Sequence, residues 1–275
     1  MAETVHPPSS DRGDSPFLVR RSPRAELAGM VSDIVGYREN GRPLAGQVEM
    51  AALVVPLVIS FGEAFTIALG RKPTDDDTYA SFTSGLYAGH VVIASGGRAE
   101  CIQIDFTPLG AYRFFRLPMS ELAGRMVTLD DLEDRHIARL RQRLGEQRNW
   151  MRRLDLAEKF VMARLHGAPP PDPALDWAYR QIRGSHGRVR IGRLASELDW
   201  SRKHLSQRFK EQLGMGPKAI ARMVRFHNAL ALARRGASPD WADIAADCGY
   251  ADQAHLAREF SQFAGASPTR LQAKA

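Results

Sequence analysis

The chain has 275 residues, of which 44% are hydrophobic and 25% are charged. This is the composition of a globular protein, and at roughly 100 to 200 residues per domain the length suits two domains. The two cysteines, Cys101 and Cys248, provide neither a disulfide framework nor a paired-cysteine zinc site. The longest apolar run, residues 51–61, is far shorter than the roughly 20 residues of a membrane helix. The sequence therefore predicts a cytoplasmic protein with no membrane partner.

The N-terminal part divides into a leader and a β-rich region. Residues 1–16 are polar and rich in Pro and Ser, which predicts a disordered leader. From Val48 to about Phe115, short β-branched or alternating apolar runs are separated by turn signals, which predicts strands. We expect residues 17–128 to form a small barrel or sandwich. Aromatic residues in the strands are core candidates that could also line a ligand cavity: Tyr79, Phe82, Tyr87 and Phe106.

Residues 129–166 show a helical period. Apolar residues recur three or four positions apart from Ile137 to Leu165, interrupted by the polar Gln147 and Glu158. Gly145 leaves open whether this segment forms one long helix or two antiparallel ones. The apolar stripe either packs on the β-rich domain or forms a dimer surface, and the sequence does not separate these alternatives.

A Pro-rich segment and a change in charge mark the boundary to the C-terminal part. Residues 167–173 read Gly-Ala-Pro-Pro-Pro-Asp-Pro, which predicts an extended linker. Residues 1–171 hold 21 Lys and Arg against 21 Asp and Glu, whereas residues 172–275 hold 17 against 10, so the net charge of +7 lies entirely in the second part. A basic domain after a neutral one indicates that the second domain meets a polyanion.

The basic part contains one sequence pattern twice. Four residues of the first copy recur at an offset of 51, and the pair Leu194-Ala195 recurs as Ile244-Ala245 at an offset of 50, so the second copy has one extra residue in its turn. The four pairs are Leu205 and Leu256, Phe209 and Phe260, Gly214 and Gly265, and Pro217 and Pro268.

Each copy reads as a short helix, a tight turn and a longer helix. Ser201 and Asp252 are the expected N-caps of the longer helices, which Gly214 and Gly265 end. This arrangement is the one that presents a second helix to a DNA major groove. Residues 217–235 read as a connecting helix, and about 19 residues at 1.5 Å each span about 28 Å, close to the about 34 Å between successive major grooves.

Both copies resemble a known family. Residues 243–271, DIAADCGYADQAHLAREFSQFAGASPTRL, resemble the second helix-turn-helix of the AraC/XylS-type transcriptional regulators, and residues 194–225 resemble the first with its linker helix. Residues 102–122 resemble the N-terminal sensor-like domain of one branch of that family. The resemblance implies an α+β protein with an all-α DNA-binding domain at residues 174–275. It also implies promoter DNA and RNA polymerase as partners, control by a small effector or partner through the N-terminal domain, and a homodimer as one further partner.

The residues expected to contact DNA lie off the apolar stripes of the two longer helices. Arg and Lys suit guanine, Gln suits adenine, and Arg208 and Lys210 are equally suited to phosphate. Asp252 is interpreted as a cap, and Glu259 as a residue that phosphate repels. The predicted DNA-binding residues are Arg202, Lys203, Ser206, Gln207, Arg208, Lys210, Gln253, His255 and Arg258.

Other functions have weaker support in the sequence. The sequence contains no phosphate-binding loop, and residues 75–77 read as a solvated acidic loop. His90 lacks a histidine partner at the spacing of a chelating pair. The sequence therefore predicts no cofactor, no metal site and no enzyme activity. Two alternatives remain: a constitutive DNA-binding dimer without an effector, and a DNA-repair alkyl acceptor. The second would need an activated cysteine, whereas Cys101 and Cys248 read as small buried hydrophobic residues.

Overall fold

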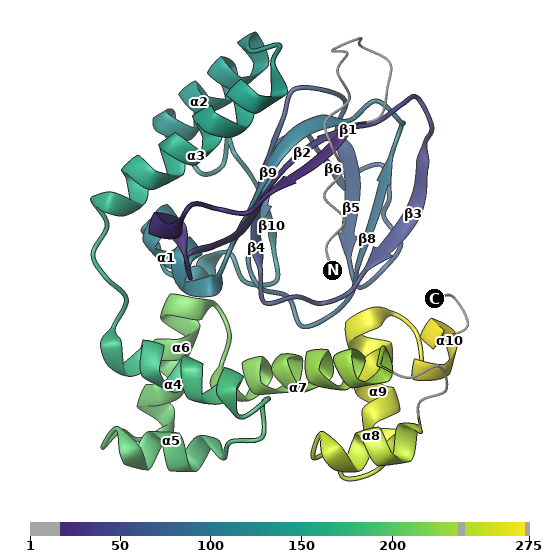
Figure 1. The fold of residues 1–275 in the computed structure, drawn as a ribbon, viewed down its shortest axis with the longest axis vertical. Coiled ribbons are helices and arrows are strands. Elements are labelled where there is room, and N and C mark those ends of the chain that lie inside the picture. Colours follow the sequence, from purple (N-terminus) through teal and green to yellow (C-terminus); the bar gives the residue numbers. More distant parts are fainter. Residues whose placement is uncertain (1–16, 236–239, 273–275) are drawn as a thin grey trace.

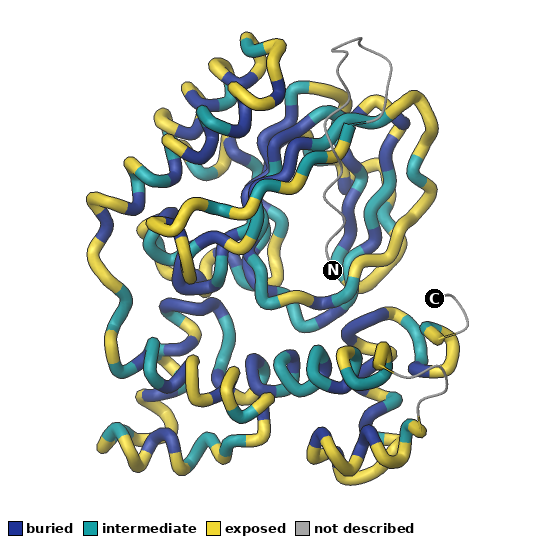
Figure 2. Tube along the Cα trace, viewed as in Figure 1, coloured by how far each residue is buried: buried dark blue, intermediate teal, exposed yellow. Residues whose placement is uncertain are grey.

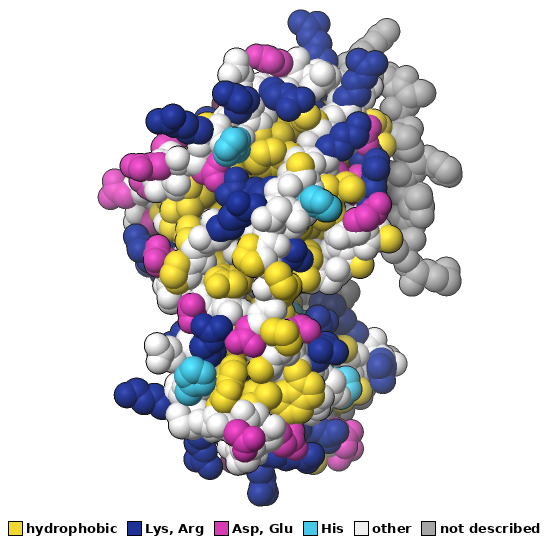
Figure 3. Space-filling view, turned by 90° about the vertical axis from the view of Figure 1, so that its left-hand side faces the viewer, with side chains coloured by type: hydrophobic (Ala, Val, Ile, Leu, Met, Phe, Trp, Pro, Cys, Tyr) yellow, Lys and Arg dark blue, Asp and Glu magenta, His cyan; other side chains and the backbone are white. Residues whose placement is uncertain are grey.

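The computed structural model describes residues 17–235 and 240–272. The predicted leader, residues 1–16, lies outside the described residues. An N-terminal lobe of β-sheets and helices sits on an all-helical C-terminal lobe (Figure 1). In the side view a narrower waist separates the two lobes (Figure 3). The α+β fold class is confirmed.

The N-terminal lobe contains two antiparallel sheets, one of six strands in the order β1-β2-β9-β4-β7-β10 and one of four in the order β3-β8-β5-β6. Because the two sheets are separate and have free edges, the fold is a sandwich and not a closed barrel. The strands are β1 (Phe17–Arg21), β2 (Val31–Arg38), β3 (Leu44–Glu49), β4 (Val55–Ser60), β5 (Phe65–Leu69), β6 (Thr78–Tyr79), β7 (Phe82–Ser84), β8 (Val91–Ser95), β9 (Glu100–Phe106) and β10 (Met126–Thr128).

The central strands of the six-stranded sheet carry a different set of side chains on each face. On β9, Ile102, Ile104 and Phe106 join the core beneath the helices, whereas Cys101 belongs to the cluster between the sheets. This alternation follows from the period of two along a strand. The sheet thus has one face for the helices and one for the smaller sheet, and Figure 2 shows the buried strands in dark blue.

Two expectations for this lobe need correction. The strands begin at Phe17 and not at Val48, because β1 and β2 precede that residue and β3 begins at Leu44. The end of the predicted strand region forms a helix, α1 (Pro108–Phe115). Thr107 caps this helix, because its Oγ1 accepts a hydrogen bond from Gly110 N, and Pro108 occupies the first turn. A proline at that position favours a helix start over a strand. Two short 3-10 turns, η1 (Ala25–Leu27) and η2 (Met119–Glu121), complete this part.

The helical segment after the sheets forms two helices, α2 (Arg135–Glu146) and α3 (Trp150–His166). Asn149 caps α3 by accepting a hydrogen bond from Arg152 N at 3.0 Å, so the chain breaks after Gly145 and does not run on as one helix. The apolar stripe, except for the exposed Met151, is buried in the core that covers the six-stranded sheet. The stripe therefore packs within the N-terminal lobe.

Glu158, a polar residue within the apolar stripe, forms ion pairs. Its carboxylate is buried and lies 3.2 Å from Arg24 Nε and 3.6 Å from Arg21 NH1. These contacts hold the β1 end of the sheet to α3. A buried charge needs such partners, since leaving it unpaired would cost several kcal/mol.

The C-terminal lobe begins after the Pro-rich segment. Asp172 caps its first helix by accepting a hydrogen bond from Ala174 N at 3.0 Å. No helix of the described part of the chain combines the length and the apolar content that crossing a bilayer requires. The helices are α4 (Pro173–Gly184), α5 (Ile191–Glu197), α6 (Arg202–Leu213), α7 (Pro217–Ala233), α8 (Trp241–Asp247), α9 (Gln253–Ala264) and α10 (Pro268–Gln272).

Candidate nucleic-acid interface

The two helix-turn-helix units repeat each other in their hydrogen bonds. We define the first unit as α4–α6 and the second unit as α7–α9. Ser201 Oγ accepts from His204 N at 3.0 Å at the start of α6, and Asp252 Oδ1 accepts from His255 N at 2.6 Å at the start of α9. Both predicted N-caps are confirmed.

The turns show where the extra residue lies. Trp200 N and Tyr250 N each donate at 2.9 Å to the carbonyl of an alanine in the preceding helix. The left-handed residue before them is Asp199 in the first unit and Gly249 in the second. One residue separates Asp199 from the cap Ser201, whereas two separate Gly249 from Asp252, so Ala251 is the extra residue.

The helix α7 connects the units by belonging to both cores. Ile220 and Ala221 pack in the cluster of α4, α5 and α6, whereas Met223, Phe226 and Ala229 pack in the cluster of α8 and α9. Its 17 residues are two fewer than expected, since the helix ends at Ala233. A helix packed on both sides fixes the spacing of the two units.

The helices α6 and α9 point in the same sense relative to the N-terminal lobe. The C-terminal end of α6 contacts η2, where Gly214 lies against the backbone of Met119. The C-terminal end of α9 also contacts the N-terminal lobe, at a different place. Phe263 O accepts a hydrogen bond from Ala51 N at 2.7 Å, and Gln262 O accepts one from His90 N at 3.1 Å. The first turns of both helices therefore lie away from the N-terminal lobe, toward the bottom of Figure 1.

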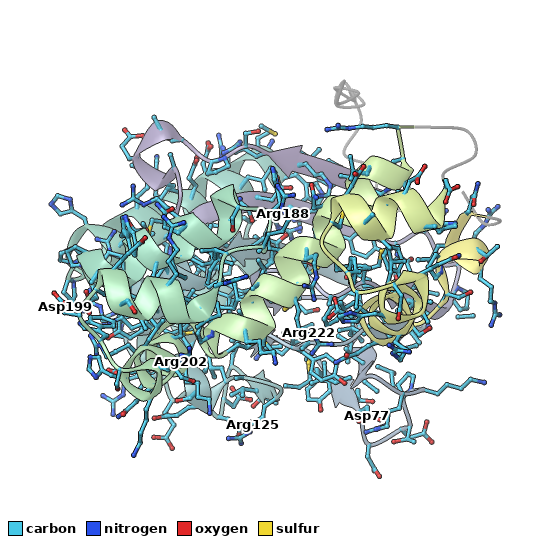
Figure 4. The ribbon with its side chains drawn as sticks, turned by 90° about the horizontal axis from the view of Figure 1, so that it is seen from below. Asp77, Arg125, Arg188, Asp199, Arg202 and Arg222 are labelled. Atoms are coloured by element: carbon cyan, nitrogen blue, oxygen red, sulfur yellow. The ribbon has the colours of Figure 1, made fainter. Side chains whose placement is uncertain are left out.

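Most of the predicted DNA-binding residues are exposed on these two helices. Ser206 is half-buried, with its hydroxyl near the chain at Gly216. The exposed residues are Arg202, Lys203, Gln207 and Lys210 on α6, and Gln253 and Arg258 on α9. Figure 4 views the underside of the lobe, where Arg202 is labelled. The first helix thus presents three basic residues and the second helix one.

Arg208 is engaged within the protein. Its guanidinium donates to Asp172 at 3.0 Å and to Glu211 at 2.8 Å, and the side chain is 27% exposed. Asp172 is the cap of α4, so the pair connects α6 to the start of the first unit. Contact of Arg208 with DNA would therefore compete with these two ion pairs.

His255 is similarly drawn inward. Its ring packs edge-on against Tyr250 at 5.2 Å, as His204 packs against Trp200 at 4.6 Å, so the stack recurs in both units. Its Nε2 also lies 3.5 Å from Glu259. The ring therefore supports the turn, and DNA contact from His255 would compete with these interactions.

Glu259 is a buried partner for cations. Its Oε1 accepts from Arg222 Nε at 2.7 Å and from Arg225 NH2 at 3.1 Å. It occupies the position equivalent to Arg208, at the offset of 51. The carboxylate thus holds α9 to α7, and its charge is neutralised before any phosphate approaches.

A basic hollow lies between the first unit and α9. It measures about 780 Å³ and extends from the start of α5 over α7 to α9. Figure 4 labels Arg188 and Arg222, two of its residues. The sequence indicated these residues only through the basic excess, since none lies on the predicted longer helices except Arg258. The basic residues that line it are Arg188, Lys218, Arg222, Arg225 and Arg258.

The sandwich encloses a cavity of about 230 Å³ between its sheets. Of the four aromatic residues considered for such a cavity, Phe82 and Tyr87 line it. Phe106 instead lies on the helix-facing side of β9, which follows from the alternation of side chains along a strand. Tyr79 does not line the cavity and packs against Phe82 with ring centroids 6.0 Å apart.

The groups considered for enzyme chemistry are occupied with structural contacts. Burial raises the pKa of the Cys101 thiol to about 12, with Glu39 and Glu100 adding to it, and burial also raises the pKa of Cys248. The Asp77 carboxylate accepts hydrogen bonds from Arg71 NH1 and NH2 at 2.7 Å each, and it also accepts one from Thr74 N. A thiol that stays protonated is the opposite of an activated nucleophile.

Known proteins show the following similarities. Residues 194–274 match the family model described as a helix-turn-helix domain. No protein of curated function matches the chain. Solved structures of ToxT from Vibrio cholerae are similar at 10% identity: an apo variant covers 92% of this chain and 98% of its own with a TM-score of 0.45, and the unsaturated fatty acid bound wild type covers 92% and 96% with a TM-score of 0.46.

A third structure is similar over a shorter range. The AraC-like transcriptional activator CuxR is 15% identical, covers 71% of this chain and 89% of its own, and has a TM-score of 0.26. The matched model covers both longer helices and the helix between them, so the C-terminal lobe contains a helix-turn-helix domain.

Proposed function

We propose that the protein is a sequence-specific transcription regulator that reads two successive major-groove segments of a promoter. One observation carries the proposal: α7 belongs to both cores, so the exposed first turns of α6 and α9 are held at a fixed spacing. Recognition helices place their N-terminal residues deepest in the groove. Arg202, Lys203 and Gln253 are then the base-reading candidates, and Lys210 and the basic hollow contact phosphate.

We further propose that the N-terminal lobe controls the second unit. Gln262 Nε2 donates to Ala88 O at 2.8 Å, and Gln262 Oε1 accepts from Arg222 NH2 at 2.7 Å, the same arginine that binds Glu259. His227 Nε2 lies 2.8 Å from Ala51 O. Ala51 and the neighbours of Ala88 line the inter-sheet cavity, so an effector bound there would act on the contacts that hold α9.

The test begins with selection of DNA from a random pool by the full chain. Arg202→Ala should then lose about 1 to 3 kcal/mol on the selected duplex and relax one base preference. Arg139→Ala, which removes an exposed arginine of α2, is the matched control and should leave affinity unchanged. Raising the salt concentration should weaken binding steeply.

Three outcomes would count against this function. Failure of the pool to enrich any sequence removes sequence-specific reading. An equal loss on selected and scrambled duplexes makes Arg202 a phosphate contact. Affinity that does not change with salt contradicts the role assigned to the basic residues.

A further inference from the structure

The walls of the inter-sheet cavity are apolar. They come from both sheets, since Val58 and Phe82 belong to the larger sheet and Ile67, Val91 and Ile93 to the smaller one. A site of this kind binds a small ligand through its apolar body and orients it with a few polar groups. At about 230 Å³, the cavity suits a compact molecule.

Two carboxylates from opposite sheets supply the polar end. Asp105 is half-buried on β9 and accepts a hydrogen bond from Gln103 Nε2 at 2.8 Å, whereas Glu49 ends β3 at the exposed mouth. Neither forms an ion pair with any described residue, and the described lining contains no Lys, Arg or His. Arg20 lowers the pKa of both carboxylates but is itself paired with Asp33 at 3.0 Å.

The surroundings disfavour the charged form of both groups. Burial raises the pKa of Asp105, and the neighbouring Asp33 adds to this although Gln103 opposes it. The protein atoms around Glu49 raise its pKa even though its side chain reaches solvent, and repulsion from Asp105 adds to this. A cation placed between the two carboxylates would relieve both costs, whereas an anion would increase them.

We infer that this cavity binds a small molecule with an apolar body and one amine or amidine cation, held by Asp105 and Glu49. The inference rests on the proposed effector role of the N-terminal lobe, and it names the chemistry of the effector. Met50, Ala51 and Gly89 line the same cavity and border the contacts to α9. Binding of such a cation is therefore expected to change the affinity for operator DNA.

The experiment compares three compounds that share a phenyl body and differ in charge: phenethylamine, phenethyl alcohol and phenylacetate. Calorimetry with the full chain should give binding of the amine about tenfold tighter than that of the alcohol, because a hydrogen bond to a charged group is worth about 1.5–3 kcal/mol. Phenylacetate should bind more weakly than the alcohol. The amine alone should shift binding to the DNA selected above.

Two variants remove the charges without removing the shape. Asp105→Asn and Glu49→Gln should each reduce the preference for the amine about tenfold. Asp76→Asn, at an exposed loop carboxylate, is the control and should leave that preference unchanged. Glu49 lies at the mouth, so its variant keeps the test valid if Asp105→Asn folds poorly.

The outcomes separate the two proposals. Phenylacetate binding as tightly as the amine, an amine preference that survives in both variants, or no binding of any compound would overturn the assigned ligand chemistry. Specific DNA binding without amine binding would leave the regulator intact and remove this ligand. Amine binding without DNA binding would instead remove the proposed function.

Discussion

The two helix-turn-helix units share a sequence pattern but differ in what they expose and in how the N-terminal lobe holds them. The first exposes Arg202, Lys203 and Lys210, where the second has Gln253, Ala254 and Ser261 at the equivalent positions. The first meets the N-terminal lobe through packing of α6 on α1 and η2. The second is held by hydrogen bonds to the segments beside the cavity.

The difference teaches how one duplicated motif can serve two purposes. Charge concentrated on the first unit favours affinity for phosphate and bases. Under the proposed function, hydrogen bonds from cavity-lining segments make the second unit the one expected to respond to a ligand. A ligand shifts DNA binding only if it favours one of two such states.

The largest effect is expected from the equivalent core residues Phe209 and Phe260. Both are fully buried, so Phe209→Ala and Phe260→Ala should each cost about 3 to 5 kcal/mol of stability. Phe260 also packs against Phe226 at 4.9 Å and Trp241 at 5.5 Å, which places its variant at the upper end. Denaturant unfolding measures both, and a greater loss for Phe209→Ala would refute this ranking.

The next comparison uses the equivalent ion-paired residues Glu259 and Arg208. Glu259→Gln leaves Arg222 and Arg225 without a buried anion and should cost about 3 kcal/mol. Arg208→Gln removes a pair with partly exposed partners and should cost less than about 1 kcal/mol. Urea unfolding measures both losses of stability. Equal losses would contradict the prediction that the more buried ion pair contributes more to stability.

Local signals made the C-terminal fold predictable from sequence. The caps Ser201 and Asp252 and the left-handed Gly214 and Gly265 act within a few residues of themselves, so one chain suffices to read them. Because the pattern occurs twice, each cap and each helix end could be recognised in two places. The extra turn residue followed from the change of offset between 50 and 51.

The remaining features depend on contacts between distant residues. The β3 strand is mostly exposed and its pattern lacks a clear apolar face, so nothing local distinguishes it from a loop. Arg208 and Glu259 both looked like surface residues of a helix, because their partners Asp172 and Arg222 lie 36 and 37 positions away. The cavity carboxylates meet only when the two sheets pack together.

A smaller effect is expected at the equivalent turn residues Gly249 and Asp199. Gly249 has φ 72°, and a methyl group there would meet only Arg188 at 3.5 Å, so Gly249→Ala should cost about 1 kcal/mol through backbone strain alone. Asp199 has φ 53°, and Asp199→Gly should raise stability by about 0.5 kcal/mol. Thermal unfolding measures the change in stability of both variants. Changes of the same sign would contradict the prediction.

The smallest effect concerns pH at the start of the first unit. Burial alone would raise the pKa of Asp172, but hydrogen bonds from Arg208 and from the α4 backbone outweigh it, and the pKa lies below its ordinary value. The folded state therefore gains stability from this carboxylate near pH 7 and loses it as the pH falls below about 4. Asp172→Asn retains a capping oxygen and removes the charge, so it should cost less than about 1 kcal/mol at pH 7.

The difference between wild type and Asp172→Asn should then shrink as the pH falls, because protonation removes the same charge from the wild type. Urea unfolding at pH 7 and near pH 3 measures that difference. Asp176→Asn, whose pair with Arg180 is exposed at 3.1 Å, is the matched control on the same helix. A difference that stays constant with pH would mean that Asp172 acts through its cap alone, and the link between Arg208 and the first unit would then add nothing to stability.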